Sequence, residues 1–315
     1  MELEDIRNIA VIGAGLMGHG IALEFAAAGY SVHLHDLTSD ILARAMDNVK
    51  ANLAMLAEAG IITAEQAETA PARIAPTTNL EDAARDADIV IEAVAEKLEV
   101  KHDVFRRLDA LCPPRTILAS NSSTLMPSQL APATKRPDRV LVAHYWNPPY
   151  LLPLVEIVGS PQTSAQAIET VYQLMKKLGK SPVVMRKEAP GFIGNRLQFA
   201  LFREALAIVE RGIASPEDVD LVVRSSFGRR LSVAGPFEVF DLAGYDVIYG
   251  ACTYLFPDLD ASTEPSPLLR ERVERGELGV KAGKGFYTWT HESAQALRRR
   301  IADALVWLNA KAQRS

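Results

Sequence analysis

Short apolar runs alternate with longer amphipathic stretches over the first 187 residues. Residues 8–12 are apolar without a polar alternation, which is typical of a parallel strand buried on both faces. Further strands are predicted at residues 31–35, 74–76, 89–94, 116–120, 140–143, 154–158 and 181–185. Helical periodicity predicts helices at residues 17–28, 39–60, 96–111 and 164–178, and Thr63 to Gln66 has the pattern of a capping box that opens another. This alternation predicts an α/β fold, a Rossmann-type doubly wound, mostly parallel sheet.

The pattern changes after Lys187, where only helical periodicity remains. Helices are predicted at residues 192–209, 217–226, 239–256, 268–275 and 294–312. A chain of 315 residues is long for one domain and suits two. We therefore expect a Rossmann domain over residues 1–187 and a smaller all-α domain over residues 188–315.

Composition narrows the class of protein. Hydrophobic residues make up 48% of the chain and charged residues 23%, which is ordinary for a soluble globular protein. A net charge of −5 argues against a nucleic-acid partner, and no apolar run approaches the ~18 residues of a membrane span. The two cysteines, Cys112 and Cys252, fit no metal-ligand spacing, so no metal is expected. The N-terminus lacks the pattern of a signal peptide, which favours a cytoplasmic protein.

A glycine motif, Gly13-Ala14-Gly15-Leu16-Met17-Gly18, lies between the first predicted strand and the helix after it. In this context Gly13 permits a tight turn, Gly15 lets the backbone approach a pyrophosphate, and Gly18 lets the helix and strand pack closely. The backbone of Leu16 and Met17 would join the same phosphate site at the helix N-terminus. The motif predicts a dinucleotide site.

Asp36 follows the second predicted strand and indicates which dinucleotide binds. A carboxylate at this position accepts hydrogen bonds from the ribose hydroxyls and repels a 2′-phosphate. No arginine follows it immediately. The expected cofactor is therefore NAD.

A histidine and a glutamate lie at the ends of two neighbouring predicted strands. His144 leaves the strand at residues 140–143, and Glu156 lies in the strand at residues 154–158, after a proline-rich turn. This placement can bring the imidazole against the carboxylate, the pairing of a positioned general base. With a hydride acceptor nearby, the pair predicts a dehydrogenase acting on an alcohol.

Three further segments complete a recognisable set, Ala119 to Leu125, Pro190 to Arg196 and Gly283 to Tyr287. In this order, with His144 and Glu156, they resemble the 3-hydroxyacyl-CoA dehydrogenase family. The resemblance covers the chain from Ile9 to about Tyr287. It implies oxidation of an L-3-hydroxyl to a ketone in fatty acid metabolism, with dimerisation through the helical domain.

The resemblance also implies roles for individual residues. His144 matches the catalytic base and Glu156 its orienting carboxylate. Ser123 and Asn195 match the family's contacts to the substrate oxygen. Glu96, Lys101 and Asn147 match residues that line the cofactor.

The chain departs from the acyl-CoA members of the family in two places. Residues 51–73, where those enzymes carry cationic partners for CoA phosphates, contain no lysine and one arginine. Arg230 lies five residues before Gly235-Pro236, as in the branch that includes L-gulonate 3-dehydrogenase (lambda-crystallin) and resembles L-carnitine dehydrogenase. An arginine can bind a free carboxylate with two hydrogen bonds. A small free 3-hydroxy acid therefore stays open as the substrate beside a short acyl-CoA.

Two other classes fit less well. The lysine-dependent β-hydroxyacid dehydrogenases would need a lysine at position 191, which is Gly191. A non-enzymatic NAD-binding protein of the crystallin kind would not need the full set of His144, Glu156, Ser123 and Asn195.

Overall fold

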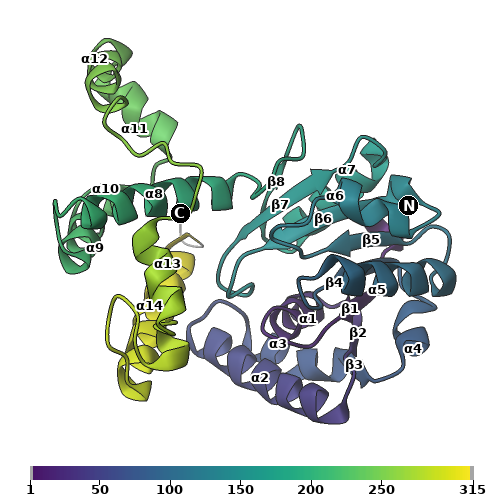
Figure 1. The fold of residues 1–315 in the computed structure, drawn as a ribbon. Helices are drawn as coiled ribbons and strands as arrows, with labels where there is room; N and C mark the ends of the chain where they lie inside the picture. The colour runs from purple at the N-terminus through teal and green to yellow at the C-terminus, as the bar shows by residue number, and fades with distance from the viewer. Residues whose placement is uncertain (1–2, 313–315) are drawn as a thin grey trace. The chain divides into compact units, whose positions relative to one another are not determined.

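The computed structural model describes residues 3–312 of the chain, which form two compact units (Figure 1). The first unit contains residues 3–193 together with residues 299–312, and the second contains residues 194–298. The boundary expected after Lys187 thus lies a few residues before the division that the contacts define. Residues 299–312, which we assigned to the helical domain, belong to the first unit instead.

The first unit is built on one eight-stranded sheet in the order β3-β2-β1-β4-β5-β6-β7-β8. Its strands are β1 (Asn8–Ile12), β2 (Ser31–His35), β3 (Ile74–Thr77), β4 (Ile89–Glu92), β5 (Ile117–Ser120), β6 (Val140–Tyr145), β7 (Leu154–Gly159) and β8 (Ser181–Val184). β7 runs antiparallel to β6, and the other neighbouring strands are parallel. The predicted doubly wound, mostly parallel sheet is therefore confirmed.

Helices cover both faces of this sheet, because successive side chains of a buried strand point to opposite faces. In β1, Ile9 and Val11 join one apolar cluster, whereas Ala10 and Ile12 join another. The first cluster lies under α1 (Gly18–Ala27), α2 (Ser39–Glu58) and α7 (Ala165–Lys177), and the second under α4 (Leu80–Ala84), α5 (Leu98–Leu111) and α6 (Pro127–Leu130). The short helices α4 and α6 were not predicted.

Local capping fixes where several of these helices begin. The side chain of Thr38 accepts a hydrogen bond from Ile41 N at 3.3 Å, one residue before the start we expected for α2. Thr63 and Gln66 form the predicted capping box of α3 (Ala64–Thr69). The remaining short elements are the 3-10 helices η1 (Leu3–Asp5), η2 (Ala70–Arg73), η3 (Ala131–Ala133), η4 (Pro137–Arg139) and η5 (Val280–Ala282).

The second unit is helical, as the sequence predicts. It contains α8 (Gly194–Glu210), α9 (Pro216–Ser225), α10 (Phe227–Arg230), α11 (Pro236–Ala243), α12 (Tyr245–Leu255), α13 (Pro267–Glu274) and the first part of α14 (His291–Ala312). The single helix expected over residues 239–256 was wrong, because Gly244 adopts a φ of +87° and separates α11 from α12. Within residues 3–312 no helix combines the length and the apolar character that a membrane crossing requires.

Candidate active site

The glycine motif forms the turn between β1 and α1, and each of its glycines meets a different structural requirement. Gly13 has a φ of +103°, and a Cβ on it would lie 2.6 Å from the carbonyl oxygen of Ala93. A Cβ on Gly18 would collide with the carbonyl oxygen of Gly13. Apart from its chain neighbours, a Cβ on Gly15 would meet no atom of residues 3–312 within 4 Å, so the backbone there is open to a ligand.

Asp36 is fixed against this turn. Its Oδ2 accepts a hydrogen bond from Ala14 N at 2.7 Å, and its Oδ1 accepts one from Leu37 N at 2.7 Å. The carboxylate at the end of β2 and the glycine turn at the end of β1 therefore lie side by side. The open backbone at Gly15, the N-terminus of α1 and this carboxylate fit the pyrophosphate and ribose of a dinucleotide.

His144 and Glu156 are directly opposite each other in the antiparallel pair of β6 and β7. His144 Nδ1 lies 2.9 Å from Glu156 Oε2. Both residues are buried, with 5% of His144 and 1% of Glu156 exposed. The carboxylate orients the ring through Nδ1, which leaves Nε2 as the nitrogen that can take a proton from a substrate.

Three neighbours of this pair were not foreseen from the sequence. Ile193 N donates to Glu156 Oε1 at 2.8 Å, and Trp146 Nε1 donates to Glu156 Oε2 at 3.4 Å. The ring of Phe192 lies 5.4 Å from the His144 ring between centroids. Phe192 is fully buried and has a φ of +51°, a strained conformation for a residue with a side chain. Helical periodicity had predicted a helix from this residue, so the turn that brings it to His144 was missed.

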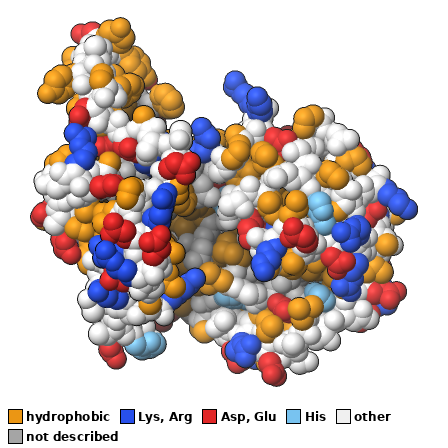
Figure 2. Space-filling view, in the orientation of Figure 1, with side chains coloured by type: hydrophobic (Ala, Val, Ile, Leu, Met, Phe, Trp, Pro, Cys, Tyr) orange, Lys and Arg blue, Asp and Glu red, His pale blue; other side chains and the backbone are white. Residues whose placement is uncertain are grey.

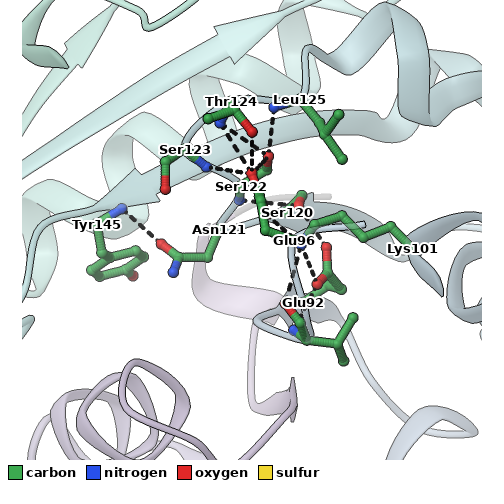
Figure 3. A network of polar contacts seen from close by, with 11 residues as sticks. Glu92, Glu96, Lys101, Ser120, Asn121, Ser122, Ser123, Thr124, Leu125 and Tyr145 are labelled. Atoms are coloured by element: carbon green, nitrogen blue, oxygen red, sulfur yellow. Dashed lines mark hydrogen bonds and ion pairs between the residues drawn. The ribbon is translucent and has the colours of Figure 1, made fainter. Parts of the chain in front are cut away.

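The loop after β5 carries Ser123 and is held by the carboxylate of Glu96 (Figure 3). Glu96 Oε1 accepts hydrogen bonds from Ser123 N at 3.0 Å, Thr124 N at 3.1 Å and Thr124 Oγ1 at 2.9 Å. It also accepts a short hydrogen bond from Ser122 Oγ. A single carboxylate oxygen therefore fixes three consecutive residues of the loop.

The electrostatics of Glu96 follow from these contacts. Burial acts to raise its pKa, but the hydrogen bond from Ser122, the charge of Lys101 and the hydrogen bonds from Thr124 outweigh it and lower the pKa to about 2. Glu96 is therefore a carboxylate at any working pH, and it can act as an acceptor for the loop throughout.

Lys101 lies beneath this loop with only 1% of its side chain exposed. Its Nζ contacts Glu92 Oε1 at 2.7 Å and Glu96 Oε2 at 3.2 Å. Glu92, fully buried at the end of β4, also accepts from Ser120 Oγ at 2.5 Å. The ammonium group of Lys101 thus contacts the carboxylates that support the loop. Sequence reasoning missed Glu92, because it ends an apolar strand and belongs to no recognised motif.

The loop after β5 also meets the strand that carries His144. Asn121 Oδ1 accepts a hydrogen bond from Tyr145 N at 2.9 Å, and Figure 3 shows the amide pointing to that strand. Ser123 is half-buried, two residues after Asn121. Asn147 is exposed, three residues after His144, at a cis peptide bond with Pro148. The structure therefore gathers the Ser123 loop and the His144–Glu156 pair at one edge of the sheet.

Two predicted substrate contacts belong to the second unit. Asn195 lies in the first turn of α8, and Arg230 is the exposed last residue of α10.

The glycine turn between β1 and α1 and the buried histidine–carboxylate pair of β6 and β7 fit an NAD-dependent dehydrogenase. Comparison with known proteins gives its family. Residues 8–189 match the model of the 3-hydroxyacyl-CoA dehydrogenase NAD-binding domain, and residues 191–289 match that of its C-terminal domain. The chain belongs to the 3-hydroxyacyl-CoA dehydrogenase family and is an oxidoreductase of that type with NAD as its cofactor.

Individual relatives match over most of their length. The chain is 35% identical to 5-formyl-3-hydroxy-2-methylpyridine 4-carboxylate 5-dehydrogenase of Mesorhizobium japonicum, over 96% of each chain. A crystal structure of an enzyme of this name, described as an NAD+-dependent dismutase, superimposes with a TM-score of 0.91 at 34% identity over 96% of this chain and 97% of that chain. A probable 3-hydroxybutyryl-CoA dehydrogenase of Bacillus subtilis is 37% identical, over 92% of this chain and all of its own.

Proposed function

We propose that the protein oxidises the L-3-hydroxyl of an acyl-CoA to a 3-keto group, with His144 as the general base. The buried contact of 2.9 Å between His144 Nδ1 and Glu156 Oε2 carries this proposal. Nε2 takes the proton from the hydroxyl, and Glu156 stabilises the imidazolium that forms. NAD, when bound, accepts a hydride from the carbon that carries this hydroxyl.

The other groups of the site prepare this transfer. Ser123, held by Glu96, and Asn195, at the start of α8, donate hydrogen bonds to the reacting oxygen, so charge that develops there meets donors already in place. Such donors are worth several kcal/mol only when they are prearranged. The anchoring of residues 122–124 by one carboxylate oxygen supports this role for Ser123.

We place the cofactor at the carboxyl ends of β1 and β2 in the first unit. The backbone of Gly13 to Gly18, including Leu16 and Met17, would hold its pyrophosphate, and Asp36 would accept hydrogen bonds from its ribose hydroxyls. Asn147 and Glu96 border the nicotinamide end. Lys101 acts there through Glu96, since its own ammonium group is buried.

A free carboxylic acid is the second candidate substrate. Two observations favour it, the absence of lysine from residues 51–73 and the TM-score of 0.91 to an enzyme whose name describes a pyridine carboxylate. In this case Arg230, exposed on α10, binds the carboxylate. The proposed role of Arg230 applies only if the substrate is a free acid.

Rates of NAD reduction on matched substrates distinguish the two candidates. The panel contains L-3-hydroxybutyryl-CoA, free L-3-hydroxybutyrate, L-gulonate and L-carnitine. We expect turnover on the thioester, and the Arg230→Gln variant should then leave its KM unchanged. Turnover on a free acid alone, with a KM that rises at least ~10-fold in Arg230→Gln, would replace the first candidate by the second. No turnover on any member of the panel would contradict both candidate substrates.

We also propose that the second unit forms a homodimer with a second copy of the chain. It exposes many large apolar side chains, among them Phe199 at 63%, Phe237 at 79% and Tyr249 at 77%. Figure 2 shows such side chains gathered on the helices α11 and α12. Apolar patches of this kind mark protein interfaces. Sedimentation at micromolar concentration should give a dimer, and a monomer would contradict the proposal.

The cytoplasmic location stays a prediction.

A further inference from the structure

The turn between β6 and β7, residues 146–153, is held by side chains from distant parts of the chain. Lys180 Nζ donates to Pro149 O at 2.5 Å and to Leu152 O at 3.1 Å. Asn309 Nδ2, on α14, donates to Leu151 O at 2.8 Å. These carbonyls lie in a proline-rich segment outside any ladder of strand hydrogen bonds, so the side chains take the place that a backbone partner would fill.

Lys180 is itself fixed from the helix that begins at the glycine motif. It forms a close ion pair with Glu24 of α1, and its side chain is 5% exposed. The same helix packs on the turn directly, since a Cβ on Gly20 would lie 2.6 Å from Pro149 Cγ. Residues of α1 thus contact both the ammonium group and the turn that it holds.

The turn leads directly to the proposed base. Trp146, its first residue, donates to the same oxygen of Glu156 that His144 contacts. Asn147, the next residue, is the one we place beside the nicotinamide. A displacement of the turn would therefore act on the orientation of the histidine–carboxylate pair and on the cofactor side of the site together.

Asn309 lies in a part of the chain that the family models do not reach. Their match ends at residue 289, and α14 begins at His291. Ala302, Leu305 and Val306 of this helix pack against the core cluster that underlies α1 and α7. The contact from Asn309 is therefore part of a docked helix and not an isolated surface contact.

We propose that Lys180, fixed by Glu24 and assisted by Asn309, is a positioning residue for the reaction. It holds residues 146–153 so that Trp146 and Asn147 keep the catalytic pair and the nicotinamide edge aligned. This inference rests on the proposed function, because it assigns Lys180 a part in the orientation of His144. A misplacement of ~1 Å in a catalytic group can cost about 10²-fold in rate.

The test separates positioning from stability. Lys180→Met alone would leave a buried carboxylate unpaired and lose stability for that reason. Burial raises the pKa of Glu24 to about 7 although Lys180 opposes it, so the pair carries a large desolvation cost. Replacing both partners by apolar residues of similar size, as in Glu24→Leu/Lys180→Met, is often neutral for stability. We expect this double variant to fold, and it removes the side-chain donor to Pro149 O and Leu152 O while Asn309 still donates to Leu151 O.

We expect the double variant to keep its thermal midpoint and its Kd for NAD within about twofold, while kcat falls ~10- to 100-fold. Asn309→Leu, which removes the donor to Leu151 O, should also keep its thermal midpoint and its Kd for NAD, and its kcat should fall by a smaller factor. Lys177→Met, an exposed lysine at the end of α7, is the control and should match the wild type.

A double variant with wild-type kcat would overturn the proposal, since the pair would then serve stability alone. If the double variant does not fold, Asn309→Leu decides, and an unchanged kcat there has the same meaning. All rates are compared with that of the wild type. If the proposed function is wrong, the wild type itself turns over no substrate of the panel. If only this inference is wrong, the wild type is active and the variants match it.

Discussion

Nδ1 of His144 and Oε2 of Glu156 lie 2.9 Å apart across the antiparallel pair of β6 and β7. The register places them directly opposite each other, and burial shields their contact from solvent. The other oxygen of Glu156 accepts from Ile193 N at 2.8 Å, so the carboxylate is fixed on both sides. The sheet therefore provides an oriented imidazole with one nitrogen left for proton transfer.

Glu156→Gln should keep the fold but lose the charge that stabilises the imidazolium. We expect kcat to fall by ~10²-fold or more, because a neutral amide also permits the wrong ring tautomer. Steady-state rates and the Kd for NAD, measured on the same preparation, check this. A variant with wild-type kcat would show that Glu156 is only a structural partner of His144.

Gly15→Ala and Gly18→Ala should fail in different ways. Among the described residues, a Cβ at residue 15 meets no atom within 4 Å beyond its chain neighbours, whereas one at residue 18 collides with the backbone of Gly13. We expect Gly15→Ala to keep its thermal midpoint and to bind NAD at least ~10-fold more weakly, because the methyl group occupies the approach of the pyrophosphate. Gly18→Ala should lower the midpoint. Titration with NAD and thermal unfolding separate the two, and equal NAD affinity in Gly15→Ala would contradict the placement.

Asp36→Ser should shift the preference between cofactors. The substitution removes the charge that repels a 2′-phosphate and the acceptors for the ribose hydroxyls, so the ratio of NAD to NADP affinity should fall by ~10-fold or more. Asp40→Ser, an exposed acidic residue in the first turn of α2, is the control. An unchanged ratio would place the ribose elsewhere.

The anchoring of the Ser123 loop should depend on pH through Glu96. Its pKa is lowered to about 2 in the fold from an ordinary value of 4.5, so the folded state favours the carboxylate. The stabilisation it gives is fully present above pH 4.5 and is lost as the pH falls toward 2.

The difference in thermal midpoint between the wild type and Glu96→Gln should therefore be constant near neutrality and shrink over that acid window. Glu68→Gln, on an exposed face of α3, is the control and should show no such change. A difference that stays constant down to pH 2 would mean that Glu96 does not anchor the loop as a carboxylate.

The sequence predicted the architecture well because most of the strands are short and rich in apolar residues, and helical or turn patterns separate them. The same alternation set His144 and Glu156 at facing ends of two strands. What it could not predict depends on long-range contacts. In the sequence, Glu92 lies in a predicted strand and Lys101 in a predicted helix. In the structure their side chains form an ion pair beneath the Ser123 loop.

Backbone conformation explains the remaining differences. Periodicity cannot reveal that Phe192 adopts a φ of +51° or that Gly244 interrupts a helix, since both depend on what surrounds them. The helical pattern of residues 294–312 likewise predicted a helix without showing that its end packs on the first unit. The position of Asn309 near Leu151 follows only from that docking.

The most direct test of the account is the rate of NADH formation by the wild type and by His144→Ala on L-3-hydroxybutyryl-CoA, with the NAD affinity of both measured in parallel. The account predicts that the wild type reduces NAD and that the variant loses ~10²- to 10⁴-fold in kcat while its Kd for NAD stays within about twofold. A variant that turns over at the wild-type rate would show that His144 is not the base, and the proposed mechanism would be wrong.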